Sequence, residues 1–212
     1  MTRFSKQSGH TLIELLIAMV ICLIIIGSAV AVFSGALSTR QREQDRTDAI
    51  TSAQAALNIA SREIGNSGYG LLSTNGLVLA DCNANSLRFR ANIVNSVAAS
   101  NSTSASTTTD PGEDVVFLYD AASQSVVRFD KNTGTTSGVI NQVSDVDFEY
   151  YDYNSITGAV TGPFTVASAN TARVTVVLEV FLKDVQGQPT GRVEAVKSDI
   201  TLRNAPVMLG QY

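Results

Sequence analysis

The sequence predicts an α+β fold in which one long N-terminal helix packs on an antiparallel β-sheet head. Three observations lead to this prediction. Residues 15–33 are almost entirely apolar, residues 34–64 keep a helical apolar stripe without a proline, and the remainder shows the two-residue alternation of half-buried strands. With 212 residues, 44% hydrophobic content and a formal net charge of -4, the chain fits one membrane-type helix and one modest globular domain.

The apolar run is long enough to cross a bilayer. Ser28 is the only polar side chain between Leu15 and Ser34. At 1.5 Å per helical residue the run covers about 28 Å, close to the thickness of a hydrocarbon core. A secretory signal has an apolar core of about 7–15 residues followed by a small-residue cleavage site. Here the core is longer and the small residue, Gly9, precedes it, so the sequence favours a retained transmembrane helix.

An acidic residue stands at the start of this run. Glu14 follows the sequence Gly9-His10-Thr11-Leu12-Ile13. An ionised carboxylate at full depth in a bilayer costs about 2.5–3.5 kcal/mol. We therefore expect Glu14 to need a positively charged partner, and the alternative is a carboxylate that snorkels to the membrane surface.

The order of glycine, glutamate and apolar run resembles the class III signal of type IV prepilins and pseudopilins. The resemblance implies that a prepilin peptidase cleaves between Gly9 and His10 and methylates the new N-terminus at His10. It also implies that Glu14 neutralises the N-terminal amine of a neighbouring subunit during filament assembly. The family usually has phenylalanine at the position of His10, so this chain departs from the pattern there.

On this interpretation residues 1–9 are a leader peptide and residues 10–33 are the transmembrane or filament-core helix. Arg3 and Lys6 precede the apolar run, so the positive-inside tendency predicts an inner-membrane protein with a cytoplasmic N-terminus and a periplasmic head. Removal of the leader takes away these two cations and no acid, which changes the side-chain charge from -4 to -6. This acidic balance gives no sign of a nucleic-acid-binding surface.

Residues 34–65 are expected to continue the helix as an amphipathic segment that packs on the head. A stretch of mixed charge at residues 39–46 leads into apolar positions spaced three and four apart, which are Ile50, Ala53, Leu57, Ala60 and Ile64. We expect one helix over residues 11–64, on the order of 80 Å long. Gly65 and the Gly68-Tyr69-Gly70 cluster are expected to end it.

Residues 66–212 have the character of a β-rich head. Strands are predicted at residues 86–91, 115–119, 125–129, 146–150, 173–182 and 196–202, with turns at 130–134, 154–158 and 186–191. Their apolar face is expected to pack, as one antiparallel sheet, on the stripe of the helix. Residues 95–110 are mostly Ser, Thr, Ala and Asn, so we expect a mobile surface loop, with a weak glycosylation-type triplet at Asn101.

The sequence offers no conventional catalytic site. Its one histidine is His10, which excludes a Ser-His-Asp or Cys-His site in the head. No phosphate-binding loop, H-E-x-x-H motif or paired C-x-x-C motif occurs. A carboxylate pair acting as acid and base is the remaining enzymatic possibility. We expect a protein that is not an enzyme and that needs no metal or cofactor.

Two groups in the head invite a ligand interpretation. Asp145, Asp147, Glu149 and Asp152 supply the oxygen atoms that calcium prefers, but the first three alternate along one strand, which favours a solvated strand face. The aromatic residues nearby are expected to serve the core or subunit contacts, and they are Phe148, Tyr150, Tyr151, Tyr153 and Phe164.

The two cysteines are not expected to form an intrachain disulfide. Cys22 lies in the membrane segment and Cys82 in the head, which places them much farther apart than the Cα separation of about 4.4–6.8 Å that a disulfide allows. Both are predicted to be free thiols, and a bridge between chains through Cys82 is the alternative.

A second layer of resemblance appears in the head. Residues 62–64 leading to 68–70, the segment 143–151 and the ending 200–204 are similar to minor pilins of the PilW type and to minor pseudopilins of the GspJ type. The resemblance implies a minor pilin that primes or caps a type IV pilus and supports adhesion, twitching motility or DNA uptake. Its implied partners are other major and minor pilin subunits, the prepilin peptidase and the inner-membrane assembly platform.

Two alternatives remain at this level. One is a minor pseudopilin of a type II secretion system, which has the same architecture. The other is an uncleaved membrane-anchored periplasmic binding protein or adhesin, which would keep residues 1–9 and tolerate the loss of Glu14.

Overall fold

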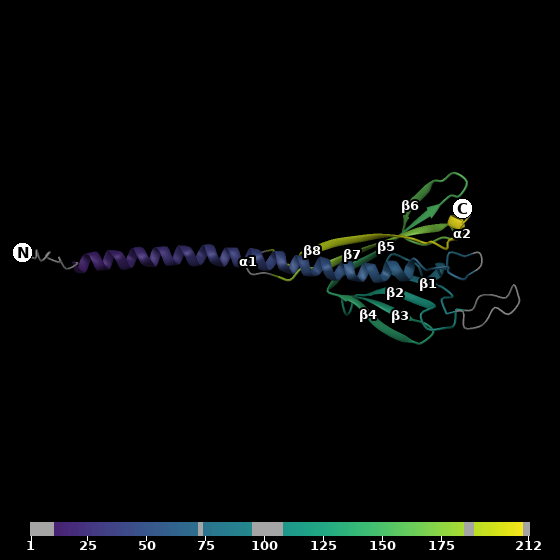
Figure 1. Ribbon diagram of the computed structural model, residues 1–212, viewed down its shortest axis with the longest axis horizontal. Helices are drawn as coiled ribbons and strands as arrows, with labels where there is room; N and C mark the ends of the chain where they lie inside the picture. Colours follow the sequence, from purple (N-terminus) through teal and green to yellow (C-terminus); the bar gives the residue numbers. More distant parts are fainter. Residues whose placement is uncertain (1–10, 72–73, 95–107, 185–188, 210–212) are drawn as a thin grey trace, which may run out of the picture.

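The computed structural model describes residues 11–71, 74–94, 108–184 and 189–209. One helix, α1 (Leu12–Ile64), extends through most of the length of the molecule, and two β-sheets gather around its C-terminal half (Figure 1). Its 53 residues correspond to about 80 Å. The predicted single helix over residues 11–64 is confirmed.

Glycine sets the C-terminal end of α1. Gly65 follows the last helical residue, and its N–H donates to the carbonyl oxygen of Ser61 at 3.0 Å. Gly68 and Gly70 have φ angles of 77° and 68°, a backbone region that side chains with a Cβ atom disfavour. The chain therefore leaves the helix axis here and turns back toward the first strand.

Sheet A is antiparallel and has the strand order β1-β2-β3-β4. Its strands are β1 (Ser86–Arg90), β2 (Asp114–Asp120), β3 (Ser125–Asp130) and β4 (Thr135–Asn141), and the short 3-10 helix η1 (Leu79–Asp81) precedes them. In β1, Leu87 and Phe89 are buried while Arg88 and Arg90 point to the other face. This alternation is what gives the sheet one apolar face.

Sheet B is also antiparallel, with the order β6-β5-β7-β8. Its strands are β5 (Val143–Tyr153), β6 (Val160–Phe164), β7 (Thr171–Phe181) and β8 (Val193–Thr201), and the short helix α2 (Pro206–Leu209) follows. The apolar positions predicted to share a face of β7 are buried, namely Val174, Val176, Leu178 and Val180.

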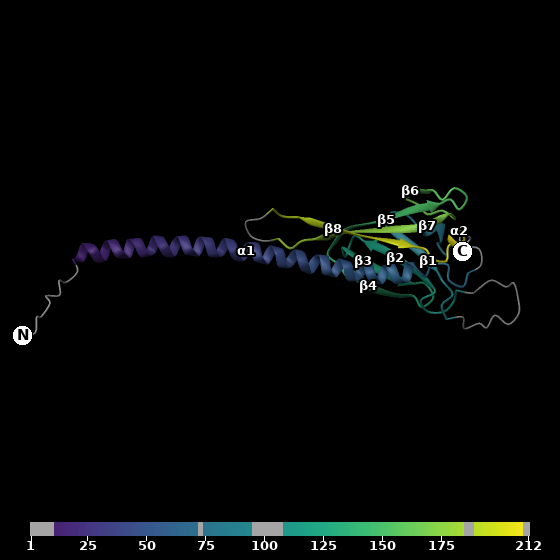
Figure 2. The same ribbon diagram turned by 45° about the horizontal axis from the view of Figure 1, so that its top comes forward.

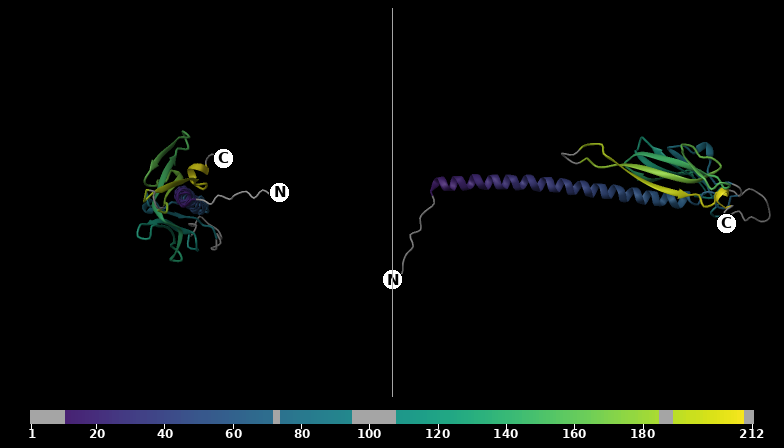
Figure 3. Two further views of the ribbon diagram at one scale, coloured as in Figure 1. Left: turned by 90° about the vertical axis from the view of Figure 1, so that its left-hand side faces the viewer. Right: turned by 90° about the horizontal axis from the view of Figure 1, so that it is seen from above.

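The core lies where the apolar faces of both sheets meet α1. Viewed along the helix, the two sheets lie on different sides of it, whereas its N-terminal half extends alone beyond the head (Figures 2 and 3). Of the predicted stripe, Ala53, Leu57, Ala60 and Ile64 are buried and Ile50 is half-buried. The side chains around them include Phe117 of sheet A and Phe148 of sheet B.

Polar contacts join α1 to each sheet at the margins of this core. Arg128 of β3 donates from Nε to Glu63 Oε2 at 2.7 Å. Arg46 pairs with Glu194 of β8 at 2.8 Å between Nη2 and Oε1. These two ion pairs, one to each sheet, add polar contacts between the helix and the head to the apolar contacts of the core.

A partly buried ion-pair cluster stabilises the outer face of sheet A. Asp114 is 5% exposed and accepts two hydrogen bonds from Arg88, both at 2.7 Å. Arg90 donates to the same carboxylate at 2.9 Å, and Arg88 also reaches Asp81 at 2.6 Å. The arrangement is charge-assisted and bidentate, which is the strong geometry for such pairs.

The structure differs from the sequence prediction in the number of sheets. The head has two four-stranded sheets instead of one, and strands β4 and β6 were not predicted. Their sequences, TTSGVIN and VTGPF, contain glycine and little regular alternation of large apolar residues, so they lack the period-two pattern. Their pairing is decided by the neighbouring strands β3 and β5.

Several predictions fall outside the described residues. These are the leader with Gly9 and His10, residues 95–107 of the loop with its Asn101 triplet, and residues 186–188 of the predicted turn. The turns predicted at 130–134 and 154–158 are described and connect β3 to β4 and β5 to β6.

Candidate functional site

The N-terminal end of α1 is closed by a capping box. Thr11 is the N-cap residue, and its hydroxyl accepts from the Glu14 N–H at 3.4 Å. The Glu14 carboxylate in turn accepts from the Thr11 N–H at 3.3 Å. The two residues therefore satisfy backbone groups that a helix start leaves without partners.

Glu14 is held only loosely in this position. Both reciprocal bonds exceed the usual range of about 2.7–3.2 Å for N–H donors, and both residues are exposed. The carboxylate also stands at the third helical position, where the helix dipole favours a negative charge. It can exchange these contacts for a stronger cationic partner at low cost.

The helix that follows Glu14 exposes its apolar side chains on all sides. From Leu12 to Phe33 the large apolar residues are between 47% (Val20) and 82% (Leu12) exposed. The most apolar window of α1 is entirely unburied, and the helix is long and apolar enough to cross a membrane. Exposed apolar surface of this extent is unstable in water, so the segment requires an apolar environment.

The polar atoms within this segment are satisfied internally. The Ser28 hydroxyl donates to the Ile25 carbonyl oxygen at 2.8 Å, and the Ser34 hydroxyl donates to that of Ala31 at 2.9 Å. Such back-bonding to the preceding turn removes the cost of placing a hydroxyl in hydrocarbon. The helix can therefore lie in a bilayer or in a packed bundle without an unpaired polar group.

The residues predicted for processing adjoin this site on its N-terminal side. Gly9 and His10 lie outside the described residues, which begin at Thr11. Of the predicted site residues the structure places Glu14, at the boundary between the helix cap and the apolar segment.

The thiols lie in very different surroundings. Cys22 is exposed on the apolar half of α1, and Cys82 is 2% exposed in the head. They form no disulfide with each other, as predicted. Burial raises the pKa of the Cys82 thiol, which donates to the Arg88 carbonyl oxygen at 3.3 Å. The head thus keeps Cys82 as a buried, unreactive side chain.

The acidic row of β5 has the solvated geometry that the sequence favoured. Asp145 and Asp147 are exposed, and Glu149 is half-buried on the same face, while Val146 and Phe148 between them point into the core. Burial, Glu149 and Asp145 together raise the pKa of Asp147. Among the described residues no group of three or more Asp, Glu, His or Cys side chains is placed to hold a metal ion.

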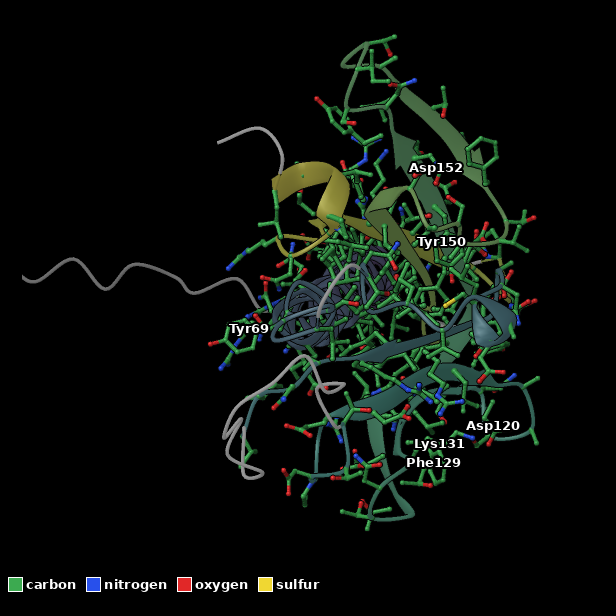
Figure 4. The ribbon with its side chains drawn as sticks, turned by 90° about the vertical axis from the view of Figure 1, so that its right-hand side faces the viewer. Tyr69, Asp120, Phe129, Lys131, Tyr150 and Asp152 are labelled. Atoms are coloured by element: carbon green, nitrogen blue, oxygen red, sulfur yellow. The ribbon has the colours of Figure 1, made fainter. Side chains whose placement is uncertain are left out.

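Asp152, the fourth acid of the predicted row, serves a local structural role. It accepts from the hydroxyls of Ser168 at 2.7 Å and Thr171 at 2.9 Å, which join the start of β7 to the end of β5. Figure 4 shows Asp152 near Tyr150 in the upper part of the head, whereas Phe129 of β3 and Lys131 of the following turn lie in the lower part.

The aromatic residues around β5 divide between the core and the surface. Phe148 and Tyr150 are buried, and the Tyr150 hydroxyl donates to the carbonyl oxygens of Asn83 and Ser86. Tyr151 lies on the opposite face, where the Arg173 guanidinium stacks 4.0 Å from its ring centroid. Phe148 and Tyr150 therefore belong to the core, in agreement with the expectation of core packing.

A comparison with models of protein families gives a match that covers the candidate site. The family model described as the prokaryotic N-terminal methylation motif matches residues 4–30. This segment contains Gly9, His10, Glu14 and most of the apolar helix. No curated protein and no solved structure matches the chain.

Proposed function

We propose that this chain, a type IV prepilin-like protein by its N-terminal methylation motif, is a minor pilin of a type IV pilus. In this role the prepilin peptidase cleaves between Gly9 and His10 and methylates His10. Through α1 the subunit then enters a filament and primes or caps its assembly, a structural role without catalysis. The observation that carries the proposal is the exposed apolar half of α1, which begins directly after Glu14.

Membrane anchoring and filament packing make the same physical demand on α1. Each fully buried Leu, Ile or Phe side chain gains about 1.5–3 kcal/mol over its exposed state. The head covers none of the apolar window of α1, so that window must be buried by lipid or by other helices. A helix that passes from a bilayer into a bundle of similar helices loses little apolar burial, which allows assembly from the inner membrane.

Glu14 supplies the directional contact in this proposal. A carboxylate carried into an apolar bundle without a partner costs several kcal/mol. The methylated amine of His10 on a neighbouring subunit is a cation at the corresponding depth. The long capping bonds of Glu14 are weak competitors for that cation.

The order of the segments favours a periplasmic head. Arg3 and Lys6 precede the apolar helix and tend to stay in the cytoplasm, whereas the head follows that helix. Minor status, adhesion, twitching motility and DNA uptake come from the resemblance of residues 62–70, 143–151 and 200–204 to PilW-type subunits. A GspJ-type pseudopilin of type II secretion shares this architecture, and the genes adjacent to this one distinguish the two machines.

The decisive experiment is mass spectrometry of the intact protein and its N-terminal peptide from native membranes. We expect a mature chain that starts at methylated His10. A Gly9→Val variant is the matched control, and it should keep residues 1–9. Retention of residues 1–9 by the unmodified chain in cells with an active peptidase would refute the proposal and favour an anchored binding protein or adhesin.

The assembly role of Glu14 is tested in the same cells. Glu14→Ala should reduce the protein in sheared filaments roughly tenfold or more while its membrane level is unchanged, because its loss leaves the partner amine unpaired. Glu14→Asp, which keeps the charge, should retain more protein in filaments. A dominant band of this chain in purified filaments would contradict minor status.

A further inference from the structure

The four edges of the two sheets are not protected equally. Edge strands expose unpaired N–H and C=O groups, which natural proteins cover or guard with charge or proline. The edge of β1 is covered, since Val78 N donates to Arg88 O and Arg90 N donates to Gly76 O. Strand β6 contains Pro163. Strand β8 carries charged side chains, among them Lys197.

Strand β4 has none of these protections over most of its length. In the part of the chain that the structure describes, only β3 pairs with it. No charged residue and no proline occurs between Lys131 and Asp145. A bulge at Val139 interrupts the ladder with β3, but Thr135–Gly138 pairs regularly and is exposed. This four-residue stretch is the unguarded edge, and Figures 1 and 2 show β4 at the outer margin of sheet A.

Gly138 at the end of this stretch has no role within the chain that requires glycine. Its φ angle lies outside the positive range that favours glycine, and a Cβ atom there would meet nothing within 4 Å. Glycine inside a strand weakens it, and it often marks a place where another backbone approaches closely. The weakening of the strand by Gly138 is explained if a second chain passes beside this residue.

An open hollow begins at Gly138, the last residue of the unguarded edge, and continues along the residues of β4 that follow it. It has a volume of about 490 Å³ and is lined entirely by uncharged residues, which are Ser123, Ser125, Gly138, Val139, Ile140 and Asn141. A chain added along β4 would direct alternate side chains to this side of the sheet. The hollow suits small or apolar side chains, because it offers no charge to pair with a charged one.

The direction of β4 restricts the partner. β1 ends beside the end of α1, where Gly68 N donates to Arg90 O at 2.9 Å, and the strands alternate in direction from β1 to β4. Strand β4 therefore runs opposite to α1. Antiparallel pairing of two β4 strands would point the two α1 helices in opposite directions, which is incompatible with insertion of both in one membrane. Antiparallel pairing between the β4 strands of two copies is thereby excluded.

We propose that the outer edge of β4, at Thr135–Gly138, is a strand-addition site for an uncharged extended segment of a different protein chain. That segment runs in the direction of α1 and forms a fifth, antiparallel strand of sheet A. Main-chain hydrogen bonds supply the affinity, and the hollow beside Gly138 selects its side chains. Processing at Gly9 plays no part in this contact, so the two proposals stand or fall separately.

The test begins with a photo-cross-linking benzoylphenylalanine placed at Ser137 of the full-length chain in its native cells. The matched control carries it at Ala195, an exposed position on the charged edge strand β8. The cross-linked segment is identified by mass spectrometry and synthesised as a peptide. Its binding to the purified full-length chain is then measured with backbone N-methyl groups at odd or at even positions.

We expect an adduct from Ser137 and none above background from Ala195. N-methylation at one parity should weaken binding roughly tenfold, because it removes one or two inter-chain hydrogen bonds, while the other parity should leave binding unchanged. Thr136→Lys should weaken binding similarly at an unchanged melting temperature, and Ala195→Lys should not. Absence of the Ser137 adduct, an adduct to β4 of a second copy, or equal effects of both parities would overturn the proposal.

Discussion

Substitution of Asp114 by Asn tests the ion-pair cluster of sheet A. The carboxylate is 5% exposed and receives three hydrogen bonds from Arg88 and Arg90 at 2.7–2.9 Å. Asparagine has nearly the same shape but no charge, and its amide nitrogen faces the arginine donors. In the variant the positive charge of Arg88, whose side chain is only 16% exposed, therefore loses the negative charge of its main partner.

The expected loss in the free energy of unfolding is near the lower end of the range for removing one partner of a buried ion pair. Removing one partner of such a pair costs about 3–5 kcal/mol. Arg88 keeps Asp81 at 2.6 Å, and the Arg90 side chain is 42% exposed to water, so we expect about 3 kcal/mol. At about 2–4 °C per kcal/mol for a domain of this size, the melting temperature should fall by about 6–12 °C.

The assay is thermal unfolding of the full-length chain in detergent, followed by far-UV circular dichroism. Asp120→Asn is the matched control, because Asp120 ends the same strand, is half-exposed, and accepts hydrogen bonds only from Ala122 and Ser123 of the turn that follows it. We expect this variant to lower the melting temperature much less than Asp114→Asn does. Equal shifts for Asp114→Asn and Asp120→Asn would refute the stabilising role of the cluster.

The pH dependence gives an independent check. Burial opposes ionisation of Asp114, but the hydrogen bonds and charges of Arg88 and Arg90 outweigh it and hold the pKa of Asp114 below its ordinary value. A carboxylate with a lowered pKa in the folded state stabilises above its unfolded pKa of about 3.9, and this stability disappears as the pH falls through the folded value. The difference between wild type and Asp114→Asn should be complete at pH 6 and shrink below about pH 4.

Three further predictions concern the core and the turns. Leu57→Ala should lower the free energy of unfolding by about 2–4 kcal/mol in denaturant titrations, because the Leu57 side chain of α1 is buried in the core that the helix forms with both sheets. A loss below about 1 kcal/mol would mean that the core around Leu57 repacks freely. Gly76→Ala should prevent stable folding, since a Cβ atom would lie 2.1 Å from Gly68 N, whereas Gly134→Ala, with open space around it, should cost only about 1 kcal/mol. In native protein in detergent, maleimide should label Cys82 only after the head unfolds, and rapid labelling of Cys82 in the folded protein would contradict its burial.

The elements predicted correctly are those with a strong local pattern. Helix α1 is specified by its uninterrupted apolar run, its three-and-four stripe and the glycines after Ile64. Strand β7 is specified by alternating valine and leucine. The proposed N-terminal site also depends on local order, that of Gly9, His10 and Glu14, and the family model matches the same stretch of the chain. Ala56 was missed as a buried helix residue because its small side chain adds little to a periodic apolar signal.

The sequence by itself therefore determined the long helix, its apolar N-terminal half, the position of Glu14 and the β character of the head. These depend on neighbours within a few residues, whose spacing is written directly in the chain. Only the tertiary structure decided that the head forms two sheets, that Asp114 meets Arg88, and that β4 is left as an unguarded edge. Those outcomes depend on contacts between distant segments, whose pairing is set by which faces are buried together and by main-chain hydrogen bonds that no residue pattern records.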